Sequence, residues 1–368
     1  MPDVAHRHSR PSAGARIEGR LARLLSGLPG SWLLRMIGEQ PLVRDGLTLD
    51  PHVQFILTAR RRKPQMIMCG PTPEEARNRN RNEIAAAGTA AGARPTRVRF
   101  VRELVVDGAD GPLQARHYAP PGSESSATAP LLVFFHGGGF VICDLDTHDE
   151  PCRMLCHFGD MHVLSVAYRL APEYPFPAPL DDCIAALRWA QQHASDFGAD
   201  PQRICAGGDS AGGNLSTVAA LAVARDGHPI AAQLLIYPTT DATQRHPSRQ
   251  LFSDGFVLTA ADMDSFTQHY FGNDRNLRSD PRVSPALSSE LAQAPPALVI
   301  TAGFDPLRDE GEAYAAALTA AGATVQLHRE RALVHGFLHM TTVVPAANAA
   351  VVQMARAFRT LIDASERR

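Results

Sequence analysis

The stretch that most constrains this chain is a run of small residues at positions 207–214, with the sequence Gly-Gly-Asp-Ser-Ala-Gly-Gly-Asn. An apolar run at 204–206 precedes it and an alanine-rich segment follows, which predicts a turn between a strand and a helix. A serine in such a turn is held in a strained backbone with its hydroxyl above the sheet, so small residues must flank it. Gly208 and Gly212 flank Ser210 in this way. The pattern predicts Ser210 as a nucleophile, although a glycine-rich turn with a structural serine fits it too.

Composition points to a globular protein that acts on small molecules. The 368 residues are 45% hydrophobic and 20% charged, which is enough to bury a large core. A formal net charge of -2 gives no general attraction for nucleic acid or an anionic membrane. The six cysteines form no C-x-x-C pair, and no cluster of metal ligands stands out. We therefore expect reduced thiols in a cytoplasmic protein, and neither a metal nor another cofactor.

Residues 1–96 are predicted to form an N-terminal cap segment. They show neither a secretion signal nor an apolar run of membrane-spanning length. The expected elements are a helix at 17–28, a helix at 32–37 with Ser31 as N-cap, and a helix that starts at Thr72-Pro73-Glu74-Glu75 and loosens over 85–93. The first two helices could lie on a membrane. We favour the interpretation that their apolar faces pack on the protein as part of a lid.

Residues 97–368 are predicted to form one catalytic domain of the α/β class. Strand patterns at 98–106 and 113–118 flank Asp-Gly turn signals, as in a hairpin. Further strands are expected at 131–135, 163–167, 204–206, 233–237, 298–302 and 324–328, with helices at 179–193 and 211–225 and a last helix carrying Val351, Met354, Phe358 and Ile362 on one stripe. This alternation predicts a mostly parallel sheet with helices on both faces. The exception is an insertion at about 240–285, with a helical stretch at 260–270, which we assign to the cap.

A second glycine run follows the strand at 131–135 and reads His136-Gly137-Gly138-Gly139-Phe140. Glycines let backbone N–H groups point at one spot without obstruction by side chains, which is how an oxyanion hole is built. Two glycine N–H groups of this run, with the N–H of Ala211, would hold the negative oxygen formed when Ser210 attacks a carbonyl. A phosphate cradle is disfavoured because the G-K-[ST] ending is absent.

A serine nucleophile needs a base and a carboxylate that orients the base. Asp305 follows the strand at 298–302, at the end where ligand-facing loops of such sheets lie. His335 comes after the last strand and beside a glycine, which favours it as the base over the other histidines. Asp309 is the rival acid, but it falls inside the helix expected after Pro306.

Five motifs together resemble the bacterial hormone-sensitive-lipase family of esterases, in its GDSAG branch. They are HGGGF at 136–140, YRLAPE at 168–173, GDSAGG at 208–213, DPLRDEG at 305–311 and HGF at 335–337. The resemblance covers about residues 97–368 and implies an α/β-hydrolase fold with a helical cap. It implies hydrolysis of short- to medium-chain acyl esters without a cofactor. The family triad falls on Ser210, Asp305 and His335, and the family oxyanion donors fall on Gly138, Gly139 and Ala211.

Other expectations concern the pocket, the partners and the alternatives. Phe140, Tyr237 and Phe256 are candidate substrate-binding neighbours of Ser210. The last strand should lie at a sheet edge, where unpaired backbone groups can recruit a second copy, so we expect a homodimer. The chemistry does not itself identify the leaving group, so amidase or peptidase activity stays open. A non-catalytic ligand-binding role stays open too, although the serine, the histidine and the glycine run are all present.

Overall fold

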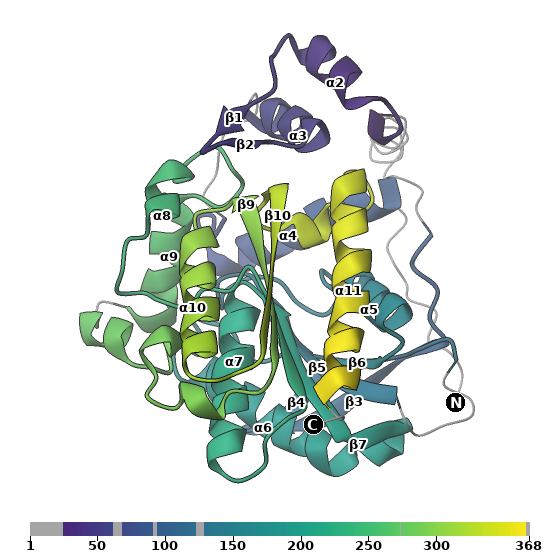
Figure 1. The fold of residues 1–368 in the computed structure, drawn as a ribbon, viewed down its shortest axis with the longest axis vertical. Helices are drawn as coiled ribbons and strands as arrows, with labels where there is room; N and C mark the ends of the chain where they lie inside the picture. Colours follow the sequence, from purple (N-terminus) through teal and green to yellow (C-terminus); the bar gives the residue numbers. More distant parts are fainter. Residues whose placement is uncertain (1–24, 62–67, 91–93, 123–128, 273, 366–368) are drawn as a thin grey trace.

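A single sheet organises the computed structural model, which describes residues 25–61, 68–90, 94–122, 129–272 and 274–365 (Figure 1). Eight strands of this part of the chain pair in the order β10-β9-β8-β7-β5-β6-β4-β3. The bounds are β3 (Phe100–Gly108), β4 (Gly111–Ala119), β5 (Ala129–Phe135), β6 (His162–Val166), β7 (Ala199–Asp209), β8 (Ala232–Ile236), β9 (Ala297–Phe304) and β10 (Val325–Val334). Only β4 runs antiparallel to its neighbours β3 and β6. The predicted mostly parallel sheet is confirmed.

Two of the strands extend well beyond their apolar cores. β7 begins at Ala199, before the apolar run at 204–206, and its polar start pairs with β5 through Ala129 and Ala199. β10 continues to Val334, after a shift in its register with β9 between Glu330 and Val334. The hydrophobic pattern of a sequence locates only the buried part of a strand. Backbone pairing can continue into polar residues, which the pattern does not identify as strand.

Helices cover both faces of the sheet (Figure 1). One face carries α5 (Asp149–Gly159) and α11 (Pro345–Ser365), and the other carries α6 (Ala178–His193), α7 (Ala211–Arg225) and α10 (Arg308–Ala320). Side chains along each strand alternate between the two layers. Leu132 and Phe134 of β5 pack on the α5 and α11 side, whereas Val133 packs on the α6 and α7 side. Such strands are buried on both faces, which explains their continuous apolar runs.

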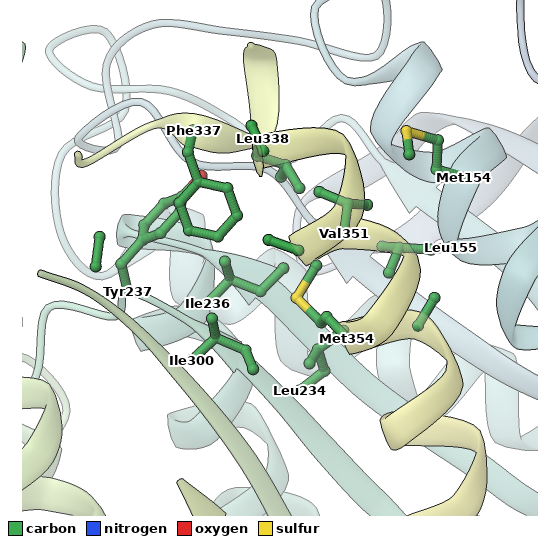
Figure 2. Packing of buried hydrophobic residues seen from close by; sticks show 14 of the residues in the cluster. Met154, Leu155, Leu234, Ile236, Tyr237, Ile300, Phe337, Leu338, Val351 and Met354 are labelled. Atoms are coloured by element: carbon green, nitrogen blue, oxygen red, sulfur yellow. The ribbon is translucent and has the colours of Figure 1, made fainter. Parts of the chain in front are cut away.

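The last helix packs by the stripe that the sequence predicts. Val351, Met354, Phe358 and Ile362 of α11 are all buried. Figure 2 shows Val351 and Met354 pointing toward Leu234 and the neighbouring strands of the sheet. Burial of such side chains contributes about 1.5–3 kcal/mol each relative to exposure. The core under α11 therefore fixes the strands whose ends carry the candidate site.

The N-terminal segment differs from its prediction at two helix boundaries. α2 (Gly30–Ile37) begins one residue before Ser31, with Pro29 at the N-cap position, so the predicted serine cap is wrong. Proline presets a helix-compatible turn there, and the first N–H groups of a helix need no intrahelical partner. α4 (Pro73–Ala90) starts where predicted, and the N–H of Glu75 donates to Thr72 Oγ1 at 3.3 Å. Its helix continues to Ala90 because alanine favours helix despite the glycine.

The remaining N-terminal elements are β1 (Val43–Arg44), β2 (Leu47–Thr48) and α3 (Pro51–Arg61). β1 and β2 form a separate two-stranded sheet. Most of the apolar stripe predicted at 17–28 lies outside the described residues. None of the helices in the described ranges is both long and apolar enough to cross a membrane. All six cysteines are buried and unpaired.

The predicted insertion holds α8 (Pro247–Leu251) and α9 (Ala260–Phe271), followed by a 3-10 helix at Arg275–Ser279. Thr259 caps α9 by a reciprocal pair of hydrogen bonds with Asp262. The other carboxylate oxygen of Asp262 accepts from the N–H of Met68 at 2.6 Å. Phe266 and Tyr270 of α9 share a hydrophobic cluster with Cys69. The insertion and the segment before α4 therefore pack on each other.

Candidate active site

The structure brings Ser210, Asp305 and His335 together above the carboxyl ends of three strands. Ser210 follows β7, Asp305 follows β9 and His335 follows β10. His335 Nε2 lies 3.1 Å from Ser210 Oγ, and His335 Nδ1 lies 2.8 Å from Asp305 Oδ2. Parallel pairing aligns these strand ends, so residues far apart in the chain meet at one edge of the sheet.

Ser210 has the strained backbone that its glycine-rich surroundings predict. Its φ is 54° and its ψ is -118°, a conformation that few residues other than glycine adopt. A Cβ atom added at Gly212 would lie 1.9 Å from the carbonyl oxygen of Phe135, and one at Gly208 would lie 2.2 Å from the same oxygen. Both positions therefore require glycine. The turn raises the hydroxyl of Ser210 to the wall of a cavity.

Hydrogen bonding around Asp305 fixes the tautomer of His335. Asp305 is fully buried, and its second oxygen accepts from the N–H of Leu307 at 2.8 Å. A buried carboxylate of this kind accepts the Nδ1–H of the imidazole. His335 Nε2 is then free to accept a proton from Ser210 Oγ. The geometry suits a serine that is deprotonated by a neighbouring histidine.

The glycine run after β5 lies beside the serine. Gly138 and Gly139 have φ values of 106° and 59°, which turn their backbone toward the cavity that also contains Ser210. The N–H groups of Gly138, Gly139 and Ala211 have no acceptor among the residues that the structure describes. Such unpaired N–H groups beside a nucleophile can stabilise an oxyanion.

A buried carboxylate that the sequence reasoning missed connects the two glycine-rich turns. Asp209 Oδ1 accepts from the N–H of Gly137 at 2.8 Å and lies 3.1 Å from His148 Nε2. Burial alone would raise the pKa of Asp209, but the charge and hydrogen bond of His148 and the N–H of Gly137 lower it below its ordinary value. The sequence does contain a signal for this role. An aspartate at the end of a buried strand must find hydrogen-bonding partners, because burial of an unpaired carboxylate is costly.

Tyr168 and Arg169 show the structural role of the YRLAPE motif at 168–173. Its hydroxyl donates to the carbonyl oxygen of His136 at 2.6 Å, and its ring stacks on the imidazole of His136 with centroids 4.5 Å apart. The next residue, Arg169, pairs with the buried carboxylate of Asp182 at 2.8 Å. Through Tyr168, the 168–173 segment therefore holds His136 and the start of the glycine run in place.

A cavity of about 1070 Å³ opens above the serine. Its wall includes Ser210, His335 and Phe140, together with residues of α3, α4 and the 240–285 insertion. Phe140 stacks on Tyr270 with ring centroids 3.8 Å apart. The structure thus brings Phe140 to the cavity, as expected for a substrate-binding neighbour.

Tyr237 and Phe256 do not line this cavity among the described residues. The ring of Tyr237 lies 4.6 Å from the ring of His335 and is itself buried. Phe256 packs against Phe252 and Phe304 in the hydrophobic core. An aromatic residue near a site in sequence is more often core than pocket, because its large apolar area favours burial.

The rival acid Asp309 is engaged away from the histidine. One oxygen accepts from the N–H of Ser248 at 2.8 Å and the other from Arg308 Nε at 2.7 Å. The next residue, Glu310, is buried beside Arg249, with 3.5 Å between Nη2 and Oε2. Glu310 Oε1 accepts from the N–H of Thr240 at 2.9 Å.

In the described part of the chain, His148, Asp209 and His339 place potential metal-ligating atoms within 4.8 Å of one another. His148 and Asp209 already bind each other directly. These two ligand atoms therefore have each other as partners within the protein.

Residues 132–339 match the family model for the alpha/beta hydrolase fold. The chain is 45% identical over 306 residues to carboxylic ester hydrolase LipN of Mycobacterium tuberculosis, covering 81% of this chain and 79% of that protein. It is 43% identical over 265 residues to esterase LipI of the same organism, covering 71% and 82%. A solved thermostable esterase from Pseudomonas putida is 31% identical with a TM-score of 0.80, and the match covers 87% of this chain and 99% of that one.

This chain belongs to the alpha/beta hydrolase fold family. The expected fold class is confirmed, as is the resemblance to the hormone-sensitive-lipase esterases. The expected enzyme class, a carboxylic ester hydrolase, is confirmed by the same relatives.

We expect Glu310→Gln to change how stability depends on pH. Burial raises the pKa of Glu310 from 4.5 to about 7, against the lowering effects of Arg249 and backbone N–H groups. A raised carboxyl pKa contributes stability that is full below pH 4.5 and is lost as the pH rises through 7. The denaturation midpoint of the wild type should therefore fall relative to the variant as the pH rises from 4.5 to about 7.

Urea denaturation at several pH values checks this expectation. Glu74→Gln, at an exposed position of α4, is the control and should run parallel to the wild type. If the Glu310→Gln profile also runs parallel to the wild type, the raised pKa of Glu310 is contradicted.

Proposed function

We propose that this carboxylesterase hydrolyses short- to medium-chain acyl esters, with Ser210 as nucleophile, His335 as general base and Asp305 as the orienting acid. The observation that carries the proposal is the continuous hydrogen-bonded chain from Ser210 through His335 to Asp305, at 3.1 and 2.8 Å. Its position at the wall of a large cavity supports the same assignment.

The first half of the reaction transfers the acyl group to the enzyme. Ser210 Oγ attacks the ester carbonyl carbon while its proton moves to His335 Nε2. Asp305 stabilises the imidazolium that forms. The tetrahedral intermediate collapses, the bond to the alcohol oxygen breaks, and His335 returns the proton to the leaving alcohol.

In the second half a water molecule takes the place of the alcohol. His335 removes its proton as it attacks the acyl-enzyme, and collapse of the second tetrahedral intermediate releases the carboxylic acid and restores Ser210. In both halves the N–H groups of Gly138, Gly139 and Ala211 hold the negative oxygen. Donors of this kind are each worth about 10²–10³ in rate in serine hydrolases.

We infer that the substrate site is formed between the catalytic domain and a cap of residues 1–96 and the 240–285 insertion. Leu57 of α3, Ile84 of α4 and Met263 of α9 contribute apolar surface to the cavity that contains Ser210. A cavity of this size, with apolar side chains on part of its wall, can hold an acyl chain. Removal of residues 1–40 should alter the chain-length preference and spare some turnover of a very short ester; an unaltered profile would contradict a lid.

The cytoplasmic location and the homodimer remain proposals. Support for a dimer comes from β10, which lies at one edge of the sheet and carries Leu327 with 43% of its surface exposed. A second copy could pair with this edge and cover that side chain. Light scattering that finds only monomers at micromolar concentration would contradict the dimer.

Ser210→Ala should abolish ester hydrolysis and leave the fold intact. Loss of the nucleophile typically costs about 10⁴-fold or more in rate. Turnover of an ester by the wild type and the variant measures the loss. Turnover of matched esters and amides by the wild type shows which leaving group it prefers. Ser253→Ala is the matched control, because Ser253 lines the same cavity. A fluorophosphonate should label the wild type at Ser210, and full activity of the Ser210 variant would exclude this nucleophile.

Asp305→Asn should lower kcat by several orders of magnitude, because asparagine favours the wrong histidine tautomer. Asp309→Asn should have a much smaller effect, since Asp309 binds Ser248 and Arg308. Steady-state kinetics of the two purified variants compares them. A larger loss in the Asp309 variant would transfer the role to that residue.

A further inference from the structure

Two arginines of the insertion line the cavity that contains Ser210. Arg249 lies in α8, and Arg278 lies in the 3-10 helix at Arg275–Ser279. Both belong to the wall that includes Ser210 and His335. The mechanism proposed above uses neither of them.

Both guanidinium groups flank residues 239–242, a segment whose first N–H group lies beside the carbonyl oxygen of Ser210. The N–H of Thr239 lies 3.4 Å from the carbonyl oxygen of Ser210, within weak hydrogen-bonding reach. Three residues later, the carbonyl oxygen of Ala242 accepts from Arg278 Nη1 at 3.3 Å. On the other side, Arg249 contacts Glu310, whose carboxylate holds the N–H of Thr240. The short segment 239–242 therefore connects both arginines to the candidate nucleophile.

The positive charge of this pair is poorly compensated. Among the described residues, no carboxylate lies within 4.0 Å of Arg278. Arg249 has Glu310 at 3.5 Å, and its buried Nε has no partner. Burial raises the pKa of Glu310 to about 7, so this carboxyl carries only part of its negative charge at neutral pH. The neighbouring Asp241 directs one oxygen to the N–H of Thr243 and pairs with neither arginine.

Several other charged groups of the wall have partners of their own. Arg60 lies 3.7 Å from Glu83, and Asp209 pairs with His148. Asp262 accepts from Met68 and from its own capping residue. Arg61 of α3 also lines the cavity, but the unused donors of Arg249 and Arg278 are the ones that flank the 239–242 segment beside Ser210.

Building on the function proposed above, we propose that the substrate is an ester that also carries a carboxylate, which Arg278 and Arg249 bind while the ester carbonyl lies at Ser210. The planar guanidinium presents paired N–H donors that match the two oxygens of a carboxylate. Such charge-assisted hydrogen bonds contribute most in a site that excludes water. The carboxylate belongs either to the acyl half or to the alcohol half of the ester.

Matched substrate pairs separate these two sources. For the acyl half, monoethyl adipate is compared with ethyl 6-methylheptanoate, in which an isopropyl group replaces the carboxylate. For the alcohol half, 4-acetoxybutanoate is compared with 4-methylpentyl acetate. A preference for the charged member in one pair identifies the half that faces the arginines. Added salt should weaken that preference, because it screens the ion pair.

Arg278→Gln should lower kcat/KM for the preferred charged ester about 10-fold or more, mainly through KM, and change the neutral isostere by less than about 3-fold. Arg249→Gln should act in the same direction, and Arg278→Lys should restore part of the loss. Arg275→Gln is the matched control, because Arg275 is exposed on the same 3-10 helix and does not line the cavity. Circular dichroism verifies that each variant folds.

Calorimetric titration of Ser210→Ala with the charged ester gives a readout independent of turnover. Binding that disappears in the double variant with Arg278→Gln would support the proposal. Equal losses on charged and neutral esters in Arg278→Gln, or a wild type that favours the neutral member of both pairs, would overturn it. If the wild type hydrolyses neither charged nor neutral esters, the proposed esterase function fails, and this inference with it.

Discussion

The site depends on one close approach between two backbones. Gly208, near the end of β7, and Gly212, in the first turn of α7, allow the serine elbow to press against the carbonyl oxygen of Phe135 at the end of β5. Any side chain at either position would push the two elements apart. This contact brings the serine elbow beside the glycine run that follows β5, and it helps to hold Ser210 at a positive φ. Strain of this kind costs of order 1–3 kcal/mol and persists only where the surroundings fix it.

Asp209 makes that arrangement electrostatically stable. A carboxylate buried this deeply costs several kcal/mol unless it is paired and hydrogen-bonded. His148 Nε2 lies 3.1 Å from Asp209 Oδ1, and the N–H of Gly137 donates a hydrogen bond to the same oxygen. Because Gly137 precedes Gly138 and Gly139, the same carboxylate holds the loop that carries the candidate oxyanion donors. Asp209 therefore helps to position both the candidate nucleophile and the N–H groups that would hold the negatively charged oxygen of the substrate.

The sheet and the segments that cover the cavity contribute different properties to it. The sheet supplies Ser210 and His335 from rigid strand ends, where small displacements are resisted by a packed core. The insertion supplies Arg249 and Arg278, and α3 supplies Leu57. In the proposed reaction the bond-breaking geometry thus rests on the sheet, whereas the shape and charge of the cavity rest largely on α3 and the 240–285 insertion. This division is how one fold accommodates many substrates.

The sequence by itself determined the eight strands of the large sheet and several of its helices, but not α5. It also determined the elbow at Ser210 and the positions of Asp305 and His335 after later strands. These features are local: periodicity marks buried elements, and glycine marks the backbone that only glycine can adopt. Tertiary structure alone decided the buried role of Asp209, the core position of Phe256 and the polar extension of β7. It also decided that two arginines of a distant insertion reach the cavity of Ser210. Such contacts join residues with no periodic relation in the chain, so only packing in three dimensions selects them.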